Sequence, residues 1–145
     1  MRRIVTATAI VSLAVVPAAV AASRTLTYQG FTSQGHEIKF KKVRAGVARM
    51  KITVRAGCTG TQGQNTGDYD FTLAATDAAA DPVRRGRFTT VLPGRSAVPT
   101  AMIKGTFNAR GVARGTITAS GHARGPKGED LGTCKSPTVR WTAGP

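Results

Sequence analysis

The chain has few acidic groups and few of the residues with which enzymes act. Its 145 residues include 7 Asp and Glu, 2 His and 2 Cys. Neither histidine lies in a recognisable nucleophile motif, and Gly-x-Ser-x-Gly does not occur. A glycosidase needs two carboxylates that flank a cleft, and the sequence offers no such pair. The composition therefore predicts a protein that is not an enzyme and that needs no cofactor.

Helical patterns are also scarce. No stretch after residue 22 sustains an apolar spacing of three and four residues, and all 17 glycines lie in that part of the chain. Short runs of alternating apolar and polar residues occur instead, separated by Gly, Pro, Asn and Asp. This pattern predicts an all-β protein, specifically a single-domain antiparallel β-sandwich of seven or eight strands with one disulfide.

The first 22 residues differ from the rest. Arg2 and Arg3 precede an apolar run over 4–20, and Ala19-Val20-Ala21 matches the small-x-small pattern of a cleavage site. These features predict a signal peptide over 1–22 and a single secreted β domain over 23–145. An uncleaved membrane anchor is the alternative. The sequence does not decide between cleavage after Ala21 and after Ala22, and ordinary secretion fits better than a twin-arginine route.

Positive charge is in large excess. The formal net charge is +14, of which Arg2 and Arg3 supply two. Such a charge favours contact with anionic material but says nothing about the fold. A GC-rich genome would also enrich arginine, so part of the excess has an alternative origin. We expect an extracellular protein, with association to the cell envelope as the finer hypothesis.

The segments 36–43 and 47–55 read as a hairpin whose turn centres on Ala45. In that register the apolar residues share one face, which burial would select. The predicted inward pairs are Phe40 with Met50, Ile38 with Ile52, and His36 with Val54.

The outward face of this hairpin is the first candidate site. The register places Lys39 opposite Lys51 and Lys41 opposite Arg49, and like charges directly across strands are destabilising. Either solvent and salt screen them, or an anionic polymer or lipid headgroup neutralises them. Nucleic acid is a poorer partner because no aromatic ring is interleaved for base stacking. The candidate anion-binding residues are Lys39, Lys41, Arg49, Lys51 and Arg55.

A second hairpin is predicted from Thr100–Asn108 and Val112–Ser120. Its register places Gly105 opposite Gly115, which suits a sharp bend or the close approach of another side chain. A last strand over 138–143 should turn Val139 and Trp141 inward.

Cys58 and Cys134 predict one intramolecular disulfide. It would close a loop of about 76 residues and stabilise the fold by about 4 kcal/mol in the chain-entropy model. A redox pair or a metal site is the alternative, although the spacing is unlike Cys-x-x-Cys and only His36 and His122 could join a metal site.

Three loops are predicted at 59–68, 74–86 and 121–132. The last is the contact surface if the chain is instead an inhibitor or another protein-binding domain. It would also hold the catalytic groups of an unrecognised hydrolase, His122 with Glu129 or Asp130. The weaker candidates are carboxylates for Ca²⁺ and aromatic rings for carbohydrate, of which Tyr69 is the best placed on the surface. They comprise Asp68, Asp70, Asp77, Asp81, Tyr28, Phe31, Tyr69 and Trp141.

Turn glycines and core aromatics recur in a characteristic order along the chain. The motifs are Tyr28-Gln29-Gly30-Phe31-Thr32-Ser33-Gln34-Gly35, Gly86-Arg87-Phe88, Lys104-Gly105-Thr106-Phe107, Ala113-Arg114-Gly115-Thr116, Cys134-Lys135-Ser136 and Trp141-Thr142-Ala143. Their order resembles a family of small secreted actinobacterial β-sandwich proteins, over nearly the whole chain after the signal peptide. Pro137 departs from that pattern, in which Gly is frequent. The resemblance implies a scaffold and no assigned chemistry, so it supplies no site residue.

Overall fold

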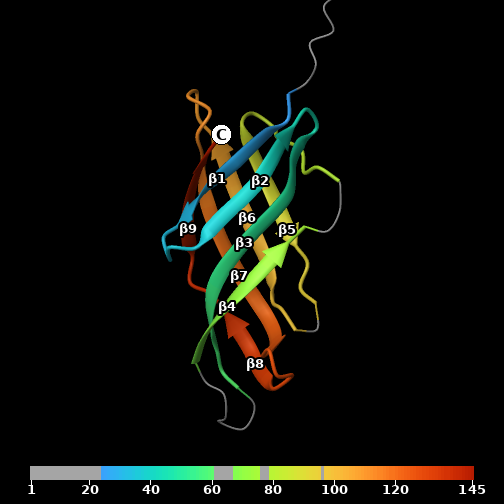
Figure 1. Cartoon of the computed structure of the whole chain (residues 1–145), viewed down its shortest axis with the longest axis vertical. Helices are drawn as coiled ribbons and strands as arrows, with labels where there is room; N and C mark the ends of the chain where they lie inside the picture. The colour runs from blue at the N-terminus through green and yellow to red at the C-terminus, as the bar shows by residue number, and fades with distance from the viewer. Residues whose placement is uncertain (1–23, 61–66, 76–78, 96) are drawn as a thin grey trace, which may run out of the picture.

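The computed structural model describes residues 24–60, 67–75, 79–95 and 97–145 (Figure 1). The predicted signal peptide lies outside these ranges. Within them the chain forms nine β-strands and no helix, and hence no helix that is long and apolar enough to cross a membrane. The strands are β1 (Leu26–Thr32), β2 (Glu37–Val43), β3 (Gly46–Cys58), β4 (Gly67–Ala74), β5 (Arg87–Leu92), β6 (Thr100–Phe107), β7 (Ala113–Arg124), β8 (Asp130–Lys135) and β9 (Val139–Gly144).

All strand pairs are antiparallel, in the order β4-β3-β2-β1-β9-β7-β6-β5. β8 stands outside this path and pairs with both β3 and β7. In Figure 1 the first four strands cross in front of β6 and β7, and β8 joins the two groups at one end. The all-β antiparallel prediction is confirmed, and the arrangement is consistent with a sandwich.

The buried faces of the two groups share one aromatic cluster. The ring of Phe40 on β2 lies 5.9 Å from those of Phe88 on β5 and Trp141 on β9, and it stacks 4.9 Å from that of Tyr28 on β1. Ring pairs at these separations add to the stabilisation from burial alone. Because inward side chains of both groups meet here, their outward faces look away from each other.

The register of the second hairpin is confirmed. β6 and β7 pair Ala101 with Ala119 and Gly105 with Gly115, as predicted. The gap left by the two glycines is filled by a third strand, since β9 pairs Trp141 with Gly115 and its indole lies against both glycines. The predicted close approach of another side chain is therefore correct.

The first hairpin is only partly as predicted. Ile38 pairs with Ile52 and Lys39 with Lys51, but the register then shifts, and Lys41 pairs with Ala48 rather than Arg49. Arg49 takes a positive φ of 52° and forms a bulge, a conformation that glycine adopts more easily. The extra residue keeps both Phe40 and Met50 buried despite the tight turn.

The predicted pair of His36 with Val54 is wrong, because the β2–β3 ladder begins at Ile38. The side chain of Gln34 continues the pairing instead. Its Oε1 accepts a hydrogen bond from the backbone N–H of Arg55 at 2.9 Å, and its Nε2 donates to the Arg55 carbonyl at 3.1 Å.

Most of the predicted loop over 121–132 is strand. β7 continues to Arg124, β8 begins at Asp130, and only a short turn separates them. The structure describes nine strands where seven or eight were predicted, and β8 is the additional strand. It places Cys134 directly opposite Cys58 on β3, and the predicted disulfide is present.

Candidate functional site

A pair of lysines occupies the centre of the outward face of β2 and β3. Lys39 and Lys51 are cross-strand partners and both are exposed. Their row continues to Gln29 on β1 and Ala74 on β4, which carry no charge. Within the described part of the chain, no carboxylate oxygen lies within 4.0 Å of either amine. Two like charges thus face each other with only solvent and salt to screen them.

Arg55 lies on the same face but is already neutralised. Its Nε is 2.9 Å from Asp70 Oδ1 and its Nη2 is 3.2 Å from Oδ2, so the guanidinium holds the carboxylate with two hydrogen bonds. The cross-strand pairing of Arg55 with Asp70 on β4 positions them. His36 Nε2 also lies 3.2 Å from Asp70 Oδ1. Arg55 is therefore a poorer binder of external anions than the two lysines.

The bulge separates the remaining predicted cations. Lys41 is half-buried opposite Ala48, whereas Arg49 is exposed at the bulge itself. The neighbouring Lys42 turns to the inner side, where its Nζ lies 4.6 Å from the ring centroid of Phe107. That contact is a cation–π interaction, which occupies the ammonium within the fold. We call Lys39, Lys41 and Lys51 the lysine face.

Replacing Asp70 with Asn should lower the free energy of unfolding slightly at neutral pH but not at low pH. The hydrogen bond from Arg55, opposed by burial and helped by the charge of His36, holds the Asp70 pKa below its ordinary value of 3.8. A carboxyl with a depressed folded pKa stabilises the fold above its unfolded pKa, and this contribution is lost as the pH falls through the folded pKa. Urea unfolding curves of wild type and variant should therefore differ at pH 7, and the difference should begin to shrink below about pH 4 and vanish below the folded pKa. A gap that persists in acid would contradict this origin.

The aromatic candidates separate clearly by exposure. Tyr28 and Trp141 belong to the core. Tyr69, predicted as the best surface ring, is half-buried and packs against the core, so it is a poor candidate. Phe31 is 67% exposed and is the better placed ring. Phe31 lies next to the C-terminal end of β1 and points to its outward face, whereas the following Thr32 is buried.

The acidic candidates that the structure describes do not assemble into a metal site. Asp70 is held by Arg55, and Asp81 lies at the far end of β3, where its backbone pairs with that of Val47. Asp77 lies outside the described residues. Where side chains are described, no group of three or more His, Cys, Asp or Glu could hold a metal ion.

His122 and Asp130 do come together. His122 Nε2 is 2.9 Å from Asp130 Oδ1, across the β7–β8 hairpin. The same oxygen accepts a hydrogen bond from the backbone N–H of Gly132, whose φ is 69°. The carboxylate thereby fixes an irregular strand, which explains the pair without catalysis. The separation is within hydrogen-bond reach, so the hydrolase alternative and the protein-binding alternative for this segment both stay predictions.

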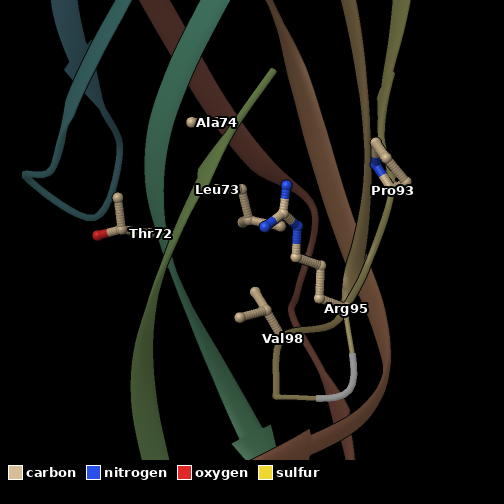
Figure 2. A pocket seen from close by; sticks show the side chains of 6 residues that line it. All are labelled: Thr72, Leu73, Ala74, Pro93, Arg95 and Val98. Atoms are coloured by element: carbon tan, nitrogen blue, oxygen red, sulfur yellow. The ribbon is translucent and has the colours of Figure 1, made fainter. Parts of the chain in front are cut away.

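A hollow of about 230 Å³ separates β4 from the connection between β5 and β6 (Figure 2). Figure 2 shows Arg95 extending from that connection toward Leu73. The lining residues include one cation and no carboxylate, histidine or cysteine, so this hollow contains no acid–base pair. They are Thr72, Leu73, Ala74, Pro93, Arg95 and Val98.

Comparisons with known proteins add nothing to this geometry: the chain matches no protein-family profile, no curated protein and no solved structure. The assignment to an actinobacterial family thus stays a prediction. The site must be interpreted from its own charges and hydrogen bonds.

Proposed function

We propose that this protein is an exported, non-catalytic binding module that attaches to anionic cell-envelope material through its lysine face. The disulfide is compatible with an extracellular location. The carboxylates of this face, Glu37 and Asp70, lie more than 4.0 Å from the two lysine amines, so a lipid headgroup or envelope polymer would supply their counter-charge. The observation that carries the proposal is the direct opposition of Lys39 and Lys51 without a carboxylate, next to an Arg55 that has one.

The contrast with Arg55 matters because the same sheet neutralises one cation and leaves two others opposed. Opposed like charges lower the stability of a sheet, and either sequence position could hold a neutral residue at no structural cost. A bound anion would turn this unfavourable pair into a favourable one. Lysine suits a diffuse anionic surface, because its ammonium is a point charge without a directional fork.

Neutralising the pair by Lys39→Gln plus Lys51→Gln should weaken binding to phosphatidylglycerol vesicles about thirtyfold. Each lysine near an anionic membrane surface contributes about 1 kcal/mol, and 1.4 kcal/mol corresponds to a factor of ten. Co-sedimentation with vesicles at low and high salt measures the loss. The same variant should unfold at a slightly higher urea concentration, because the opposed charges are gone.

The matched control is Arg110→Gln plus Lys127→Gln, which removes the same charge from exposed turn residues. It should retain most of the binding. Equal losses in the two variants would show that net charge alone governs retention, and the lysine face would then be a solvated surface. The same co-sedimentation is repeated with purified cell wall in place of vesicles. Comparing the two shows whether an envelope polymer or a lipid supplies the negative charge.

A further inference from the structure

Strands β5, β6, β7 and β9, which pack behind β1 to β4 in Figure 1, each carry the same tripeptide pattern. In this pattern threonine follows a basic residue two positions later. None of the four contains Asp or Glu. Basic and threonine positions are two apart, so both side chains of each tripeptide lie on one face of the strand. The burial pattern assigns them to the outward face, where seven of the eight residues are exposed and Thr116 is half-buried. The tripeptides are Arg87-Phe88-Thr89, Lys104-Gly105-Thr106, Arg114-Gly115-Thr116 and Arg140-Trp141-Thr142.

The register turns the four tripeptides into a checkerboard. One row across β5, β6, β7 and β9 reads Arg87, Thr106, Arg114, Thr142. The next row reads Thr89, Lys104, Thr116, Arg140. Every cation therefore has threonine as its direct cross-strand neighbour, unlike Lys39 and Lys51, which oppose each other.

The four cations are free to meet an external anion. In the described structure none of them has a carboxylate oxygen within 4.0 Å. They succeed one another diagonally from strand to strand, and diagonal neighbours in a sheet lie about 7–8 Å apart. A hollow of about 350 Å³ opens beside two of them, Arg87 and Lys104. Its other lining residues are Phe88, Thr89, Gly105, Thr106, Gly115 and Thr116.

We propose that this checkerboard binds an extended polymer of repeating phosphate groups, independently of the lysine face. Arginine presents a planar fork of N–H donors that matches phosphate oxygens, and a threonine hydroxyl can donate to the same group. Alternating the two side chains gives each phosphate a charged and a neutral donor. The zigzag of cations offers an extended phosphate chain one contact on each of the four strands.

Nucleic acid satisfies the charge but not the rest of the surface. The eight checkerboard positions contain no aromatic ring, and the exposed ring of Phe31 lies beside them on β1, opposite Thr142. A ring at one edge of the pattern gives no series of stacking partners for successive bases or sugar rings along the rows of cations. A phosphate chain without bases is the ligand that this set of donors fits best.

Long-chain inorganic polyphosphate is the probe. It is titrated at several salt concentrations against protein in which Lys39→Gln and Lys51→Gln remove the opposed pair of the lysine face. Adding Arg87→Gln plus Arg114→Gln should weaken binding at least tenfold. The slope of log affinity against log salt should become shallower by about 1.4, or about 0.7 per neutralised contact. The turn variant Arg110→Gln plus Lys127→Gln should change neither quantity appreciably.

A second pair of substitutions tests the hydroxyls without changing the charge. Thr106→Val plus Thr116→Val keeps side-chain shape and strand propensity, and should weaken polyphosphate binding about fivefold with the salt slope unchanged. Wild-type affinity in this variant would overturn the paired-donor recognition. If polyglutamate binds as tightly as polyphosphate, the ligand is not specifically a phosphate polymer. If Arg87→Gln plus Arg114→Gln weakens polyphosphate binding no more than the turn variant does, the checkerboard is not the binding site. None of these three outcomes bears on the lysine face, which the vesicle experiment tests separately.

Discussion

Removing the disulfide with Cys58→Ala plus Cys134→Ala should lower the free energy of unfolding by about 4 kcal/mol. The two cysteines are 76 residues apart in sequence, and their cross-link restricts a large part of the unfolded chain. Domains of this size have a total stability of only about 5–15 kcal/mol, so the loss is a large share. Urea unfolding of wild type and variant, monitored by circular dichroism, measures it.

The position of the bond makes a structural prediction as well. Cys134 lies on β8, which pairs with β3 at two positions and accepts backbone hydrogen bonds from Thr59 and Gly60 just beyond β3, and the disulfide is the covalent link between the two strands. Amide hydrogens of β8 should therefore exchange faster in the variant, while those in the β6–β7 ladder stay protected. The dependence of unfolding free energy on urea should also steepen, because the unfolded chain becomes more extended. A stability loss below about 1 kcal/mol would contradict the chain-entropy account.

The second hairpin and β9 were predictable because local signals agreed. Alternation, the turn ending at Gly111 and the facing glycines all selected one register, and the structure has that register. The first hairpin carried a misleading signal. Its bulge occurs at Arg49, a residue that rarely takes a positive φ, so no glycine marked the shift.

β8 was missed for a related reason. Gly132 has a positive φ within the strand, and the six residues contain only Leu131 and Cys134 as apolar side chains. Such a segment reads as a loop until its pairing with β3 and β7 is known. Its strand character is set by tertiary contacts, which a local pattern does not contain.

The candidate site divides in the same way. The opposition of Lys39 and Lys51 is local to one hairpin and was correctly predicted. The neutralisation of Arg55 needs the register between β3 and β4, which is not fixed by a tight turn signal in the sequence. The checkerboard needs β9 to pair with β7, although β8 lies between them in the chain. The basic-x-Thr pattern occurs five times in the sequence, once as Lys51-Ile52-Thr53 on β3, and only non-local pairing places the other four side by side.

The facing glycines supply the second large effect: Gly115→Ala should lower the free energy of unfolding by about 3 kcal/mol. A Cβ at this position would overlap the backbone carbonyl oxygen of Lys104 and lie 2.7 Å from Trp141 Cζ2. The carbonyl belongs to the paired strand, so it cannot withdraw without disturbing the β6–β7 ladder. Thermal or urea unfolding measures the loss, and the matched control is Gly144→Ala on β9. A Cβ at Gly144 meets no atom within 4 Å, so this control should be nearly neutral.

Gly105→Ala separates backbone from side-chain overlap, because its Cβ would overlap the Phe88 ring and lie 2.8 Å from Trp141 Cζ2. A smaller side chain can relieve that contact. Adding Phe88→Leu should therefore recover about 1–2 kcal/mol in the Gly105→Ala background, a coupling that a double-mutant cycle measures. The same Phe88→Leu change should not rescue Gly115→Ala, whose conflict is with the Lys104 carbonyl. Equal rescue at both glycines would mean that the sheet adapts to a Cβ at either position, and that the close approach of Trp141 does not require this glycine pair.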